Sequence, residues 1–166
     1  MNRFAWSLFV LAILCLVHCQ SNNDSSNQSD QPLLEEVMPG TWEAVSIYVK
    51  VNSVNNQTDS SYIFEIYEND WGPKLGVKPV KHYYESDRNY SFESRTIVDS
   101  LINRTRGKWF VNGDSIRIVT PVATYEYEVL FDGATVTLES LLDWDGDGVF
   151  DDEYTGKQRK ISRYTE

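Results

Sequence analysis

The sequence predicts an all-β domain, an antiparallel up-and-down β-barrel of about 8–10 strands. From Gly40 onward, apolar and polar residues alternate with a period of two, which is the spacing of half-buried strands. Turn-forming residues recur at short intervals, and no stretch carries the apolar stripe of a long helix. Closure into a barrel is favoured because it removes the exposed edges of the sheet.

Residues 1–19 are predicted to be a secretory signal peptide. Arg3 precedes an apolar run from Phe4 to Val17, and polar chain follows. The run is shorter than the roughly 20 apolar residues of a membrane span. Both cysteines, Cys15 and Cys19, lie in this segment, so the chain beyond it cannot form an internal disulfide.

The end of this segment, Leu16-Val17-His18-Cys19, resembles the lipobox of bacterial lipoproteins. That family has a small residue where this chain has His18. The resemblance implies that Cys19 is lipidated and anchors the protein to a membrane of the cell envelope, at the outer membrane or the cell surface. The alternative is an ordinary signal peptide cut just after Cys19, which would give a secreted protein.

Residues 20–37 are predicted to be a flexible polar linker. The stretch 20–32 has no apolar residue before Pro32, so it cannot contribute to a core. A linker of this length would hold a domain just clear of a membrane surface. The segment 31–38 can make a turn or two of helix before the first strand.

Residues 38–166 are predicted to form the barrel domain. Its strands are expected, in chain order, at 41–51, 61–68, 80–86, 89–98, 106–111 and 156–164, and in two hairpins at 108–120 and 124–140. The first hairpin turns at Asn112-Gly113 and the second at Asp132-Gly133, where such residues tolerate the positive φ of a tight turn. One face of the second hairpin carries Tyr125, Tyr127, Val129 and Phe131. This alternation predicts one dry and one wet face on each strand.

Short motifs in the barrel domain resemble the lipocalin-like domains of bacterial lipoproteins, which belong to the calycin group of barrels. They include Gly40-Thr41-Trp42 at the first strand, Gly107-Lys108-Trp109 at a later hairpin, and Arg163 at the end of the last strand. The resemblance implies that Trp42 closes the barrel floor, with the guanidinium of Arg163 stacked over its indole. Such a cation–π contact is worth about 0.5–2 kcal/mol. Arg159 is the substitute for Arg163, and the alternative is that Trp42 is only a core residue.

The many aromatic residues of these strands leave two functions open. Rings with polar tips can line a cavity and orient a small hydrophobic ligand. The same rings can instead fill the interior of a small barrel. A solid barrel would be a structural or protein-interaction module of the cell envelope, with an unspecified protein partner. The pattern assigns no residue to a ligand.

An acidic stretch, 143–153, lies just before the last predicted strand. It resembles EF-hand-like DxDxDG calcium loops, in which carboxylates alternate and a glycine makes a sharp turn. The assigned metal ligands are Asp143, Asp145, Asp147, the backbone carbonyl of Val149, and Asp151. Tyr154 replaces the bidentate Glu of such loops, with Asp152 or Glu153 as substitutes, so weak calcium affinity of about 10⁻⁴–10⁻³ M is expected. Calcium would then be structural, and the alternative is a solvated acidic turn.

Composition argues against two classes of function. A net charge of −10 without a basic cluster disfavours a nucleic-acid partner. His82 is the one histidine beyond residues 1–19, and it is expected on the surface of a strand. Because the chain also lacks a nucleophile or phosphate-binding motif, it is not expected to be an enzyme. A glycan hydrolase with two carboxylates is the less favoured alternative.

Overall fold

The computed structural model describes residues 32–52, 54 and 60–162. Cys19, the linker before Pro32 and Arg163 lie outside these described residues, so the predictions about them stay predictions. Among the residues described, no helix is long and apolar enough to cross a membrane.

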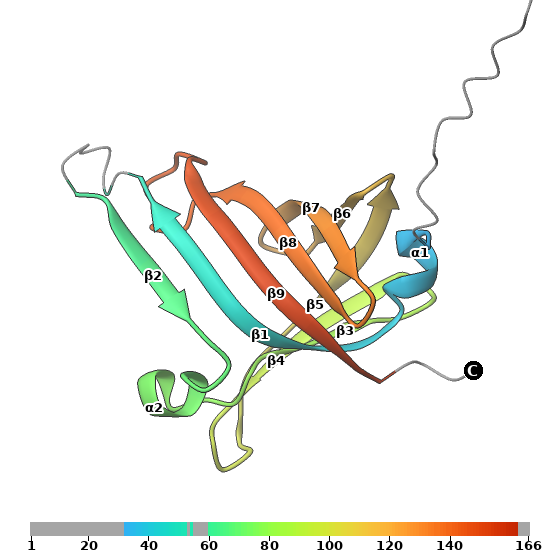
Figure 1. Ribbon diagram of the computed structural model, residues 1–166, viewed down its shortest axis with the longest axis horizontal. Helices are drawn as coiled ribbons and strands as arrows, with labels where there is room; N and C mark the ends of the chain where they lie inside the picture. The colour runs from blue at the N-terminus through green and yellow to red at the C-terminus, as the bar shows by residue number, and fades with distance from the viewer. Residues whose placement is uncertain (1–31, 53, 55–59, 163–166) are drawn as a thin grey trace, which may run out of the picture. The chain divides into compact units, whose positions relative to one another are not determined.

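The described chain is built almost entirely of strands (Figure 1). In chain order the elements are α1 Leu34–Val37, β1 Gly40–Val51, β2 Tyr62–Ile66, α2 Trp71–Leu75, β3 Lys81–Tyr84, β4 Asn89–Arg95, β5 Leu101–Asn112, β6 Ser115–Val119, β7 Thr124–Asp132, β8 Thr135–Leu142 and β9 Asp152–Ser162. Neighbouring strands pair antiparallel in the order β2-β1-β3-β4-β5-β6-β7-β8-β9, and β1 also pairs with β9. This last pairing closes an eight-stranded up-and-down barrel, which confirms the predicted fold class.

β2 is an additional strand beside the closed barrel. β1 is long enough to hold two partners along one edge, β3 at Gly40–Glu43 and β2 at Ile47–Val51, while β9 pairs along its other edge. β3 is therefore short. β2 occupies the rest of this edge of β1, is followed in the chain by α2, and does not pair with β4. The sequence predicts a strand at 61–68 but not this shared pairing, which depends on contacts distant in sequence.

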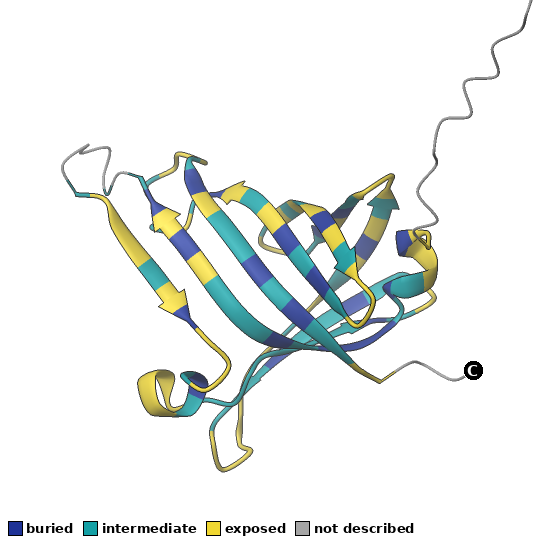
Figure 2. Ribbon diagram, in the orientation of Figure 1, coloured by how far each residue is buried: buried dark blue, intermediate teal, exposed yellow. Residues whose placement is uncertain are grey.

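The predicted alternation of dry and wet faces is confirmed in the hairpin β7–β8. Val129 is buried and Tyr125, Tyr127 and Phe131 are partly buried, whereas Glu126 and Glu128 are exposed. Figure 2 shows the same alternation as bands along β1, β8 and β9. The two hairpin turns contain Gly113 at φ 60° and Gly133 at φ 61°, the left-handed conformation that glycine adopts without strain.

One end of the barrel is closed by α1. Leu34 and Met38 from this end are buried against Trp42, Trp109 and neighbouring core residues. These residues belong to the larger cluster of buried apolar side chains. Full burial of each large apolar side chain contributes about 1.5–3 kcal/mol to stability. Trp42, the residue expected at the barrel floor, is fully buried in this core.

Among the described residues, the cation that lies over the Trp42 ring is Lys160. Its Nζ lies 5.2 Å from the indole centroid, and the indole Nε1 donates to the Met38 carbonyl oxygen at 2.8 Å. Arg159, the expected substitute for Arg163, instead pairs with Glu68 at 2.8 Å and Glu43 at 3.5 Å. The reason is the register, since β1 residue Trp42 pairs with Lys160 and successive residues of β9 face opposite sides.

Candidate functional site

The barrel contains a cavity of about 600 Å³. Its wall is mostly apolar and aromatic and comes from β1, β3, β4, β6, β7, β8 and β9 together with the loops at 120–123 and 143–151. Exposed Val122 and Phe150 place its opening at those loops, the end of the barrel opposite α1. The cavity volume falls within the range of small-molecule sites, about 300–1,000 Å³.

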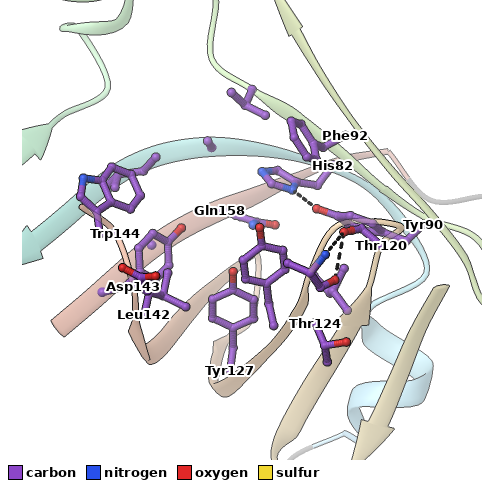
Figure 3. Close-up of a pocket in the computed structure, with 18 of the residues that line it drawn as sticks. His82, Tyr90, Phe92, Thr120, Thr124, Tyr127, Leu142, Asp143, Trp144 and Gln158 are labelled. Carbon is purple, nitrogen blue, oxygen red and sulfur yellow. Dashed lines mark hydrogen bonds between the residues drawn. The ribbon is translucent and has the colours of Figure 1, made fainter. Parts of the chain in front are cut away.

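A hydrogen-bonded pair, His82 and Tyr90, lies in the cavity wall (Figure 3). His82 Nδ1 is 2.9 Å from the Tyr90 hydroxyl. Burial lowers the pKa of His82 to about 4, so the imidazole is neutral at pH 7. The expectation that His82 is a surface residue is wrong: it lies two residues before the buried Tyr84 on β3, so both side chains face the same side of the strand, and it pairs with Phe92 of β4.

Tyr90, Tyr127 and Tyr154 contribute hydroxyl groups to the cavity wall, and burial keeps these hydroxyls protonated. Burial raises the pKa of Tyr154 to about 12 and raises the pKa values of Tyr90 and Tyr127 well above that of a free tyrosine. The rings of Tyr127 and Tyr154 contact one another, with centroids 5.7 Å apart. These side chains therefore present hydroxyl groups and ring faces, without charge, to whatever occupies the cavity.

Gln158 is a site residue that the sequence analysis missed. It projects from β9 into the space between His82 and Tyr127 and is only 3% exposed (Figure 3). Its Oε1 has no hydrogen-bond partner of good geometry among the described residues, and neither has the nearby Tyr84 hydroxyl. The spacing on β9 could have identified Gln158 as inward-facing, because it lies two residues after the buried Gly156 and two before Lys160, and residues two apart on a strand share a face.

The acidic loop brings together three of the predicted calcium ligands. Asp143, Asp145 and Asp147 each offer a carboxylate oxygen, and these atoms lie within 4.8 Å of one another. Asp151 is outside this group, and no contact is described for the Val149 carbonyl. Oxygens at this separation can share one Ca²⁺, which takes ligands at about 2.3–2.6 Å.

Hydrogen bonds inside the loop orient these carboxylates. The amide groups of Asp147 and Val149 donate to Asp145 Oδ1 at 3.1 Å and Asp147 Oδ1 at 2.8 Å, and Gly148 donates to Asp143 Oδ2 at 3.2 Å. The other oxygens of Asp143 and Asp145, which are Asp143 Oδ1 and Asp145 Oδ2, are buried without a hydrogen-bond partner in the described chain. Buried carboxylate oxygens without donors are costly unless a cation compensates them.

Asp152 fastens this loop to the barrel. It is fully buried, and its Oδ2 accepts from the amides of Trp144 at 2.7 Å and Asp145 at 3.4 Å. Its Oδ1 accepts from the amide of Asn52, just beyond β1, at 3.2 Å. Both oxygens are therefore occupied by backbone groups, and the other substitute ligand, Glu153, pairs with Lys50 at 2.7 Å.

The acidic loop also forms part of the cavity wall. Asp143 and Trp144 line the cavity. The Trp144 ring lies 5.4 Å from that of Phe64 on β2 and 6.2 Å from that of Tyr154 on β9, centroid to centroid. The position of the loop therefore determines the shape of the cavity near its opening.

The fold and site define a small closed β-barrel with an internal, aromatic-lined cavity. No protein-family model and no curated protein matches the chain. Among solved structures, it is similar to a chain described as a de novo design of a fluorescence-activating β-barrel, with 13% identity over 78% of this chain and 99% of that chain and a TM-score of 0.34.

The burial of neutral His82 predicts a loss of stability in acid. Its unfolded-state pKa is 6.5 and its folded pKa is about 4. Between these values the unfolded chain binds a proton that the folded chain does not, so the free energy of unfolding falls as the pH falls. The full effect is at most roughly 3 kcal/mol.

Urea unfolding of wild type and His82→Gln, at pH 7 and pH 4.5, checks this prediction. Both proteins share every carboxylate, so the difference between their pH dependences isolates His82. We expect the variant to lose less stability than wild type on acidification. Equal losses in the two proteins would show that His82 is not buried as described.

Proposed function

We propose that this protein is an exported, lipid-anchored barrel of the cell envelope that binds a small hydrophobic molecule inside the barrel. The observation that carries the proposal is the aromatic-lined cavity of about 600 Å³. Such a cavity can bury most of the surface of a small ligand while a few polar groups orient it. The competing function, a solid barrel that serves only as an interaction module, requires a filled interior.

Binding, rather than catalysis, is the activity that the site favours. Among the cavity groups, burial lowers the pKa of His82 and raises the pKa values of Tyr90, Tyr127 and Tyr154. A pKa of about 4 makes His82 a weak base, and the tyrosine hydroxyls stay protonated at pH 7, so none of these groups has a pKa matched to acid–base catalysis near neutral pH. The function proposed here needs no chemical step.

A cavity-filling variant tests ligand binding. Ala44 is buried in the cavity wall, so Ala44→Phe places a ring in the space that a ligand would use. We expect wild type to bind 2-methylnaphthalene in isothermal titration calorimetry and Ala44→Phe to lose at least about tenfold in affinity. The matched control is Ala134→Phe, at an exposed turn, with unchanged affinity. Equal binding by all three proteins would contradict the proposal.

The lipid anchor is tested at the two cysteines. Cys19 follows the apolar run, as the lipidated residue of a lipoprotein does, whereas Cys15 lies within the run. We expect Cys19→Ser to move the protein from the membrane fraction to the soluble fraction and to abolish incorporation of labelled palmitate. Cys15→Ser should leave both unchanged. Palmitate labelling of Cys19→Ser at the wild-type level would exclude this anchor.

The acidic loop is proposed to hold a structural calcium ion. Its support is the group of Asp143, Asp145 and Asp147, with two oxygens lacking hydrogen-bond partners. An ion that binds only the folded state stabilises it by about 2.7 kcal/mol at a concentration 100 times Kd, which raises the melting temperature by several degrees.

We expect Asp145→Asn to remove most of this calcium-dependent rise in melting temperature, measured with calcium and with chelator. Asp114→Asn is the matched control because Asp114 is exposed in the β5–β6 turn, at the other end of the barrel. It should keep the full rise. A rise of the same size in wild type and Asp145→Asn would argue for a solvated acidic turn.

A further inference from the structure

The wall of the cavity contains a buried hydrogen-bond acceptor for which no described residue supplies a donor. Gln158 is only 3% exposed, and its Oε1 lacks a hydrogen-bond partner among the described residues. The Gln158 side chain lies next to the Tyr84 hydroxyl, which belongs to the buried core. A buried amide oxygen is costly to leave without a donor, so an occupant that supplies one is favoured over an occupant that does not.

The charge in the cavity wall restricts the occupant further. Of the lining residues, Asp143 is the one acid and Lys157 is the one lysine or arginine. Asp143 belongs to the acidic loop at the opening, and Lys157 alternates along β9 with the buried Gly156 and Gln158, which directs its side chain out of the barrel. An ion deep in this cavity would lack a partner of opposite charge, and burial of an unpaired charge is expensive.

The rings around Gln158 favour a flat occupant. Phe92, Tyr127, Trp144 and Tyr154 line the same cavity. Aromatic faces and edges of this kind pack best against another ring system, in offset or edge-on contacts. The cavity therefore combines flat apolar surfaces with one inward acceptor.

We propose that the ligand is an uncharged aromatic molecule with a hydroxyl or N–H group that donates a hydrogen bond to Gln158 Oε1. This inference rests on the proposed ligand-binding function and specifies its chemical class. His82 and Tyr90, hydrogen-bonded to one another on the opposite side of Gln158 from Tyr127, close the polar part of the cavity (Figure 3).

Three probes of nearly equal size separate the possibilities in calorimetry with the wild-type protein. 2-Naphthol donates a hydrogen bond, 2-methoxynaphthalene can only accept one, and 2-methylnaphthalene does neither. We expect 2-naphthol to bind about tenfold more tightly than either of the others, which corresponds to about 1.4 kcal/mol. Equal affinities, or a preference for the methoxy compound, would overturn the assignment of a donor to Gln158.

The variant Gln158→Met keeps the length and volume of the side chain and removes its acceptor. We expect the preference for 2-naphthol to disappear, while 2-methylnaphthalene binds as it does to wild type. A preference that persists in Gln158→Met would place the donor contact elsewhere and overturn the inference. If this variant does not fold, the wild-type probe series decides alone.

The two proposals fail in different ways. If none of the three probes binds wild type, the proposed function fails, and this inference fails with it. If all three bind with the same affinity, the barrel is a ligand-binding protein and only the assignment of Gln158 is wrong.

Discussion

Replacing Trp42 with alanine is expected to lower the free energy of unfolding by about 3–5 kcal/mol, the usual cost of removing a buried indole. Trp42 is completely buried where α1 closes the barrel. The change leaves a void beneath Met38, removes the 2.8 Å hydrogen bond to its carbonyl oxygen, and deprives Lys160 of the ring that it covers. Urea unfolding followed by far-ultraviolet circular dichroism measures the loss.

The matched control for this experiment is Trp144→Ala. Trp144 is 37% exposed and lies at the cavity opening, so its removal should cost much less stability. Equal costs for the two substitutions, or a cost below about 1 kcal/mol for Trp42→Ala, would contradict the description of Trp42 as the floor of the barrel.

Replacing Asp152 with alanine is expected to be the second most damaging change, at about 3 kcal/mol. Its carboxylate accepts hydrogen bonds from the amides of Asn52, Trp144 and Asp145, and hydrogen bonds to a charged group are worth about 1.5–3 kcal/mol. Without this carboxylate, three amides lose their acceptor and the acidic loop is released from the end of β1. The measurement is urea unfolding with a chelator present, so that calcium does not contribute.

Asp151→Ala controls for the loss of a negative charge at the same place. The Asp151 backbone carbonyl accepts from Asn52, and alanine retains that carbonyl. Asp151→Ala should therefore change stability by less than about 1 kcal/mol. Equal costs for the two neighbouring substitutions would contradict the assignment of the loss to the Asp152 hydrogen bonds.

Local patterns predicted the strands and turns well. The alternation of Tyr125, Tyr127 and Val129, and the glycines at 113 and 133, each depend on neighbouring residues in sequence, and the structure confirms them. The sharing of β1 between β2 and β3 could not be predicted in this way. It is determined by which strands meet across the barrel, and the sequence pattern of β2 is equally compatible with a place in the closed wall.

The candidate site was predicted in part, for the same reason. The spacing of Asp143, Asp145 and Asp147 is local, and the structure brings these carboxylates together. The cavity residues His82 and Gln158 look like ordinary polar strand residues until pairing fixes which side of the wall they face. The sequence pattern likewise places Asp152 among the acidic residues of the loop, although it is the first residue of β9 and is fully buried.

The central claim, a ligand held inside the barrel, is tested most directly by isotope-filtered nuclear magnetic resonance of labelled protein with unlabelled 2-naphthol. We expect intermolecular nuclear Overhauser effects from the naphthol ring protons to the methyl groups of Ala44, Val80 and Ile118, which line the cavity. We expect none to Leu130 or Ile161, which are exposed and do not line the cavity. Contacts confined to exposed methyl groups such as these would contradict the claim and place the molecule on the outside of the barrel.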